Sequence, residues 1–135
     1  MTVVDTSALL ALIDAGHADH DALRRMWEAE PTACVVPWAV LPEADHMIRG
    51  RLGDRVARMF LADVASGEFS IEHSQPGDLA RAAALDAQHA DLGLGLVGGV
   101  VVAVAERLHA TAIATLDLRH FGALELPFKL YPRDL

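Results

Sequence analysis

Residues 2–13 read TVVDTSALLALI, and this stretch decides the fold class. Its first part, residues 2–4, is short, apolar and β-branched, which indicates a buried strand. Asp5 follows at once with Thr6 and Ser7, residue types that commonly begin helices, and the apolar run at residues 8–13 predicts the helix itself. The chain therefore opens with a strand, a capped turn and a helix.

The same alternation continues to the C-terminus. Further strands are expected at residues 34–36, 69–73, 111–116 and 126–130, and further helices at residues 20–30, 40–48, 56–64, 79–90 and 100–108. Strands that alternate with helices form βαβ units, so we predict an α/β fold with a parallel sheet covered by helices on both faces. A chain of 135 residues has the length of one domain, so we expect residues 1–135 to fold as a single unit.

Composition narrows the classes of protein to be considered. The net charge of −8 argues against a general nucleic-acid-coating protein, because such proteins spread Lys and Arg over a broad face. The longest uncharged apolar stretch, residues 92–105, contains four glycines and is shorter than the roughly 18 to 20 residues of a membrane helix. With no signal-like N-terminus and a single cysteine, Cys34, we expect a cytoplasmic protein that has no membrane partner.

Three acidic residues stand where a metal site would form. Asp5 and Asp117 each follow an apolar strand directly, and ligands bind beyond the carboxyl ends of strands in parallel sheets. Glu43 lies near a predicted helix start. Clustered carboxylates repel one another, and a divalent cation such as Mg²⁺ or Mn²⁺ resolves that repulsion. Taken singly, Asp5 is equally explained as a helix cap, Asp117 as a turn residue beside Arg119, and Glu43 as a complement to the helix dipole.

Three motifs in order resemble the PIN-domain family, especially its VapC-like toxins from bacterial toxin–antitoxin pairs. Residues 3–11 resemble the opening motif of that family, residues 40–44 its second acidic motif, and residues 114–121 its last. The resemblance implies a sheet of about five parallel strands, a pocket that holds Mg²⁺ or Mn²⁺, and endonucleolytic cleavage of RNA. It also implies a cognate antitoxin protein as partner, an RNA substrate and a homodimer.

The resemblance also implies roles for individual residues. Asp5 would be a direct metal ligand, and Glu43 and Asp117 would bind the metal directly or through water. Neighbouring hydroxyls would orient these carboxylates; they belong to Thr6, Ser7 and Thr115. The metal would polarise a phosphodiester and help activate water for in-line attack.

One motif departs from the family pattern. Residues 91–107 resemble its third acidic segment, in which an Asp follows the Leu-Val step, and here that position is Gly98. Because glycine supplies no ligand, we expect weak metal binding and impaired catalysis. An introduced substitution, a natural degenerate member and compensation by Asp91 are the three explanations. The non-enzymatic alternative is a PIN-like scaffold that serves only to bind an antitoxin peptide or a second copy of itself.

The remaining patterns are less specific. For contact with RNA the candidates are four basic residues, for each of which a solvated surface charge is the more ordinary explanation: Arg49, Arg51, Arg119 and Lys129. Gly93, Gly95 and Gly98 formally match a dinucleotide-binding fingerprint, but no buried strand precedes them. Acid–histidine pairs one helical turn apart, such as Glu43 with His46, would suit a di-iron bundle, yet Asp117 closes a strand rather than lying within a helix.

Overall fold

The computed structural model describes residues 1–135 and contains one five-stranded sheet. Its strands are β1 (Thr2–Val4), β2 (Cys34–Pro37), β3 (Ile71–Glu72), β4 (Ala112–Ala114) and β5 (Lys129–Tyr131). Their order is β3-β2-β1-β4-β5, and every neighbouring pair is parallel. The predicted α/β class and parallel sheet are confirmed. The strand order changes direction between β1 and β4, and such a switch point is where open parallel sheets bind ligands.

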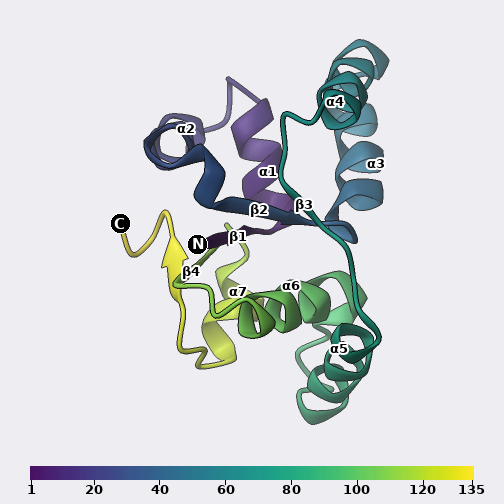
Figure 1. Cartoon of the computed structure of the whole chain (residues 1–135), viewed down its shortest axis with the longest axis vertical. Coiled ribbons are helices and arrows are strands. Elements are labelled where there is room, and N and C mark those ends of the chain that lie inside the picture. Colours follow the sequence, from purple (N-terminus) through teal and green to yellow (C-terminus); the bar gives the residue numbers. More distant parts are fainter.

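Seven α-helices connect and cover these strands: α1 (Thr6–Ile13), α2 (His20–Ala29), α3 (Val40–Leu52), α4 (Asp54–Ser66), α5 (Pro76–Gln88), α6 (Gly95–Arg107) and α7 (Leu118–Ala123). A short 3₁₀ turn, Pro31–Ala33, precedes β2. Figure 1 shows α1 to α4 on one face of the sheet and α5 and α6 on the other. None of these helices combines the length and apolar character needed to cross a membrane.

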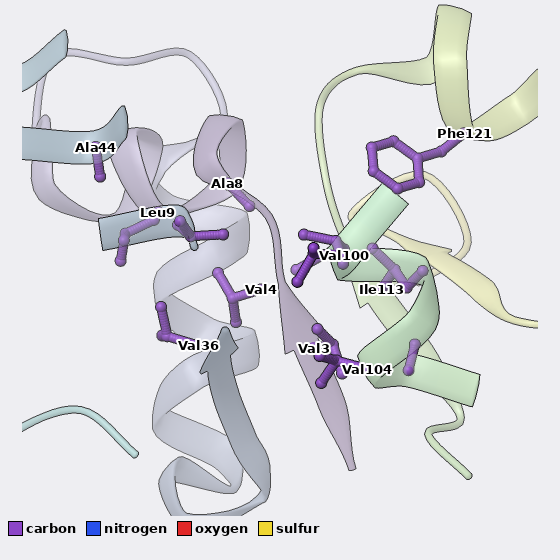
Figure 2. Packing of buried hydrophobic residues seen from close by; sticks show 14 of the residues in the cluster. Val3, Val4, Ala8, Leu9, Val36, Ala44, Val100, Val104, Ile113 and Phe121 are labelled. Carbon is purple, nitrogen blue, oxygen red and sulfur yellow. The ribbon is translucent and has the colours of Figure 1, made fainter. Parts of the chain in front are cut away.

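The core lies on both faces of the sheet because successive strand residues point to opposite sides. Figure 2 shows Val3 beside Val104 of α6, whereas Val4 points toward Leu9 of α1 and Val36 of β2. All five of these side chains are fully buried. This double burial explains why residues 2–4 form a continuous apolar run rather than an alternating one, and it fixes the position of the next residue, Asp5.

Helices α5 and α6 pack unusually closely. A Cβ on Gly99 would lie 2.7 Å from the Cβ and 2.8 Å from the Cα of Ala82, so only glycine allows this approach. An ion pair ties the same two helices together, because Asp78 of α5 is buried and accepts hydrogen bonds of 3.0 Å from Nε and Nη2 of Arg107. Arg107 also donates to Glu72 of β3 at 2.8 Å.

The structure differs from the sequence-based expectations at three places near the C-terminus. Helix α6 begins at Gly95 rather than near Val100, so Gly98 lies inside the helix. Three glycines weaken the helical propensity of α6, but burial of residues 99–105 stabilises it. Residues 118–123 form the short helix α7, where we expected a turn. The last strand begins three residues later than predicted and ends one residue later, and Pro127, which has no N–H to donate to the sheet, lies before it.

Candidate active site

An open pocket of about 530 Å³ lies at the carboxyl ends of β1 and β4. Its walls come from five places that are distant in the sequence: the start of α1, the loop before α2, one face of α3, the start of α6 and the segment that leads into α7. The three predicted acids, Asp5, Glu43 and Asp117, all line this pocket, and so does Gly98. The structure therefore brings together residues that the sequence places up to 112 positions apart.

Asp5 lies at the base of this site and is only 6% exposed. Its N–H donates to the carbonyl of Ala114 at 2.9 Å, which continues the pairing of β1 with β4. Its Oδ2 accepts hydrogen bonds from the Thr115 hydroxyl at 2.8 Å and from the Ser7 hydroxyl at 3.3 Å. The carboxylate makes no capping hydrogen bond to α1, so the helix-cap explanation fails.

The surroundings of Asp5 disfavour its charge. Burial is the main cause and raises the pKa of its carboxyl, and the hydrogen bonds from Thr115 and Ser7 only partly oppose this effect. The negative charge of Glu43 raises the pKa of Asp5 further. No Lys or Arg makes an ion pair with Asp5. A buried carboxylate with an acidic neighbour and no basic partner is an environment that a cation would relieve.

Two hydroxyls join the ends of β1 and β4. The hydroxyl oxygens of Ser7 and Thr115 lie 3.2 Å apart. Ser7 accepts from the Leu116 N–H at 2.8 Å, and Thr115 accepts from the Asp117 N–H at 3.0 Å. These contacts match the orienting role expected for Ser7 and Thr115. Thr6 differs, because its hydroxyl oxygen is buried without any hydrogen-bond partner.

Asp117 is held by a residue that sequence reasoning did not place in the site. Its Oδ1 accepts from the backbone N–H of His120 at 3.2 Å, which caps α7, and its Oδ2 lies 2.5 Å from Nδ1 of the same histidine. The local partner of Asp117 is therefore His120 and not Arg119. The spacing Asp117-x-x-His120 was visible in the sequence, but its meaning depended on α7, which was not expected.

Glu43 is the least constrained of the three acids. It lies in the first turn of α3, is exposed, and its side chain makes neither a hydrogen bond nor an ion pair. Met47 and Arg51 follow it at intervals of four residues, so the three side chains share one face of the helix, and all three line the pocket. This carboxylate is free to move toward a ligand.

Gly98 lies on the opposite side of the pocket. A Cβ at this position would come within 2.8 Å of Cδ1 of Leu94 and 4.0 Å of Phe121. The space that a side chain at residue 98 would enter is therefore occupied by the flexible end of Leu94, whereas the neighbouring Gly99 faces backbone. Asp91 is exposed and does not line the pocket, so the structure gives no support for compensation by that residue.

Comparison with known proteins supplies the next observation. The family model for the PIN domain matches residues 2–125. The chain belongs to the PIN-domain family. It is 32% identical over 122 residues to Ribonuclease VapC26 of Mycobacterium tuberculosis, and the match covers 90% of each chain. The predicted VapC-like resemblance and the predicted enzyme class, a nuclease by family, are thereby confirmed.

Solved PIN-domain structures share the fold. The crystal structure of Mycobacterium tuberculosis VapC20, described as a toxin that cleaves the sarcin–ricin loop, superposes with a TM-score of 0.81 at 24% identity, covering 96% of this chain and 99% of that one. A toxin–antitoxin complex from Klebsiella pneumoniae gives a TM-score of 0.67 at 18% identity, with the same coverage. These likenesses establish that the arrangement of strands around Asp5 is that of VapC structures.

Asp5, Glu43 and Asp117 do not by themselves form a complete set of metal ligands. No three His, Cys, Asp or Glu side chains lie close enough to coordinate one metal ion together. The chemistry of the donors still suits Mg²⁺, which binds proteins through one or two carboxylates and keeps several of its waters. Asp5 offers an oxygen, Oδ1, that accepts none of the side-chain hydrogen bonds. The residues present therefore fit an open, water-rich site rather than a tight one.

The predicted RNA-contact residues divide in their placement. Arg51 lines the pocket and makes no ion pair, whereas Arg49 points to Asp54 at 3.1 Å and Asp45 at 3.3 Å and does not line it. Arg119 is exposed beside the pocket segment but outside its lining. Lys129 pairs with Ala112, the first residue of β4, so it lies at the amino ends of the strands, whereas the acids lie at the carboxyl ends. The structure removes the reason for grouping Arg49 and Lys129 with this site.

Proposed function

We propose that this PIN-domain chain is an endoribonuclease toxin of a toxin–antitoxin pair that depends on Mg²⁺ or Mn²⁺. One observation carries the proposal: Asp5, Glu43 and Asp117 line a single pocket, and Asp5 is buried there without a basic partner. The relationship to Ribonuclease VapC26 supports RNA as the substrate and the phosphodiester as the bond hydrolysed. We further expect a homodimer in the cytoplasm, as in the sequence-based prediction.

Asp5 would hold the ion most directly, with Glu43 and Asp117 contributing through water. When bound, the ion would polarise a phosphodiester and favour attack by water. The other residues prepare the carboxylates for this task. Thr115 and Ser7 fix one oxygen of Asp5 and leave the other without a side-chain hydrogen bond, while His120 fixes Asp117. Glu43 has no competing partner, so its carboxylate is available to orient a water molecule or to accept a proton from it.

Gly98 limits this activity. The start of α6 contributes no carboxylate to the pocket, so its acids follow β1 and β4 or lie on α3, and the wall at the start of α6 presents Leu94, Leu96 and Val97. We infer that this chain binds the metal weakly and cleaves RNA slowly. We attribute this reduced activity, relative to that of the family, to residue 98 alone.

Cleavage of a labelled RNA in Mn²⁺ tests the proposed function directly. We expect slow cleavage that EDTA stops and that Asp5→Asn reduces to background. Asp21→Asn is a matched control, since Asp21 is an exposed acid of α2 that makes no hydrogen bond and lies outside the pocket. If EDTA or Asp5→Asn leaves the rate unchanged, the cleavage belongs to a contaminant and the proposal is wrong.

A binding-only scaffold is the second candidate function, and a separate apolar groove favours it. The groove has a volume of about 560 Å³ and is lined by side chains of α1, α2, α4 and the following loop: Leu12, Ile13, Trp27, Val56, Met59, Phe60 and Phe69. Four charged residues also line it: Arg24 and Glu28 form an ion pair with each other, whereas Asp63 and Glu68 make no ion pair, so the unpaired charges of the rim are acidic. Apolar walls with an acidic rim suit an amphipathic segment that carries basic residues.

We propose that the antitoxin occupies this groove with such a segment. Co-purification of the chain with its cognate antitoxin, followed by Met59→Asp, tests the assignment. Loss of the complex with retention of the thermal unfolding temperature supports it, and an intact complex contradicts it. If the complex forms while RNA cleavage is absent even in Gly98→Asp, the scaffold alternative replaces the nuclease.

A further inference from the structure

The pocket contains side chains that the proposed chemistry does not use. Arg51 is the only Lys or Arg in its lining, and His17 lies on the same lining from the loop between α1 and α2. The third cation-capable residue, His120, is already committed to Asp117. Arg51 and His17 are therefore the two basic side chains of the lining that can bind a phosphate without breaking a contact with an acid of the pocket.

The position of Arg51 relative to the acids is fixed by α3. Arg51 lies eight residues after Glu43 on the same helical face, which corresponds to a rise of roughly 12 Å along the axis. That separation places the guanidinium group away from the acids along the helix. It is suitable for contact with a phosphate that flanks the one at the acids. Arg49, two residues earlier, has its charge satisfied by Asp45 and Asp54 and is turned away from the pocket.

His17 is held in a defined orientation by its own loop. The Asp19 N–H donates to Nδ1 of His17 at 3.0 Å, so Nδ1 must be the acceptor, and the proton of the neutral ring is on Nε2. The loop around it is ordered, because the N–H of His17 donates to the carbonyl of Asp14 at 3.0 Å and the N–H of Gly16 donates to Oδ1 of Asp14 at 3.0 Å. Nε2–H is thus a hydrogen-bond donor that makes no contact within the protein.

The pocket is also asymmetric. The α6 side is apolar, and Leu96 there is 62% exposed, whereas Arg51 and His17 are both on the side of α1 and α3. An RNA strand carries its charge on its backbone and its apolar surface on its bases. The two sides of the pocket therefore match the two sides of an unpaired nucleotide.

We propose that Arg51 and His17 together bind an RNA phosphate adjacent to the one that is cleaved, and so set the register of the strand over the acids. The inference rests on the proposed function, because it takes RNA as the ligand. Arg51 supplies the charge that offsets the repulsion between the acidic pocket and the RNA backbone, and His17 supplies a directed N–H from a neutral ring. The substrate class that fits is single-stranded RNA with its bases turned toward α6.

Binding of a fluorescein-labelled single-stranded RNA oligonucleotide, measured by anisotropy in Mg²⁺ at several salt concentrations, tests this proposal. We expect Arg51→Ala to weaken binding about tenfold and to reduce the slope of log affinity against log salt by about one, since one phosphate contact is lost. His17→Ala should weaken binding by about three- to tenfold with no change of slope, because a neutral donor releases no counterion. His17→Gln, which keeps an N–H near the position of Nε2, should bind nearly as well as the parent chain.

Matched controls come from outside the pocket. His46 is an exposed histidine of α3 and Arg55 an exposed arginine of α4, and neither makes a side-chain hydrogen bond or ion pair. His46→Ala and Arg55→Ala should leave both the affinity and the slope unchanged, and thermal unfolding verifies that each variant is folded. If Arg51→Ala fails to fold, Arg51→Gln replaces it with a side chain of similar length and no charge.

The outcomes separate the two proposals. If the parent chain binds RNA and the pocket variants behave like the controls, the inference is overturned while the proposed nuclease function stands. If the pocket variants lose affinity as expected but no variant cleaves RNA, the phosphate site stands and the nuclease function is wrong. Absence of any RNA binding by the parent chain overturns both.

Discussion

Restoring an acid at residue 98 is the change that tests the site most directly. Gly98→Asp places a carboxylate on the wall of the pocket formed by the start of α6, which has none. Its Cβ would lie 2.8 Å from Cδ1 of Leu94, so that side chain must change rotamer, at a cost of about 0.5–1.5 kcal/mol. Replacing a glycine inside a helix recovers a few tenths of a kcal/mol of that cost. Without metal we therefore expect Gly98→Asp to be destabilised by about 1 kcal/mol.

Metal should reverse this order of stability. An added ligand should tighten binding at least ~10-fold, by comparison with losses of that size when even supporting groups of a metal site are removed. At saturating Mn²⁺, a tenfold tighter Kd stabilises the folded state by about 1.4 kcal/mol more than in the parent chain. For a domain of this length that is an additional Tm increase of roughly 5 °C. The rate of RNA cleavage should rise about 100-fold, the scale on which one group that stabilises transition-state charge acts.

Gly98→Ala and Gly98→Asn are the matched controls, because both add the Cβ that displaces Leu94 but neither adds a negative ligand. Thermal unfolding with and without Mn²⁺, together with single-turnover cleavage of a labelled RNA, provides the two readouts. If Gly98→Asp responds to Mn²⁺ and cleaves RNA no better than Gly98→Ala, the missing acid does not limit this chain, and the reasoning about residue 98 is refuted.

Three further predictions concern stability. Gly99→Ala should lower the free energy of unfolding by about 1–3 kcal/mol in denaturant titration, since the new Cβ meets the backbone of Ala82, and a normal Cm would show that the α5–α6 contact is not tight. Burial opposes the ionisation of Asp78, but hydrogen bonds from Arg107 outweigh it and hold the pKa below its usual range. The pair therefore stabilises the fold above the ordinary titration range of the carboxyl and loses this contribution as the pH falls through the lowered pKa. Asp78→Asn should cost about 2–3 kcal/mol at pH 7, and its difference from the parent should shrink in acid; a difference that is constant with pH would contradict this. Asp5→Asn should raise the Tm at pH 7 without metal, because burial raises the pKa of this acid and makes its charged form unfavourable, and a lower Tm would show that the ionised form is stabilised by the fold.

The sequence predicted those parts of the site that follow directly from strand patterning. Residues 2–4 are apolar because both faces of β1 are covered, so the next residue, Asp5, had to lie at the carboxyl edge. The same reasoning holds for β4 and the position of Asp117. Parallel pairing of β1 with β4 then brings the two strand ends together, which is why these acids lie in one pocket.

Features that depend on tertiary packing could not be predicted in the same way. The last strand begins three residues later than expected, so Lys129 is its first residue rather than one of its last. In a parallel sheet this places Lys129 at the amino ends of the strands, whereas the acids lie at their carboxyl ends. Helix α7 is too short to show a periodic pattern, so the bond between His120 and Asp117 was hidden. The neutralisation of Arg49 depends on where α4 begins, which places Asp54 beside it.

The hydroxyl contacts between Ser7 and Thr115 also determine when the pocket can exist during synthesis. A ribosome makes the N-terminal residues first, and a nascent chain that ends before β4 contains Asp5 and Glu43 but lacks the strand that lies beside Asp5 and the hydroxyl that fixes its carboxylate. Asp117 and its histidine emerge later still. An arranged site is therefore absent until β4 and Asp117 have been translated, so a product that terminates before them has no assembled pocket.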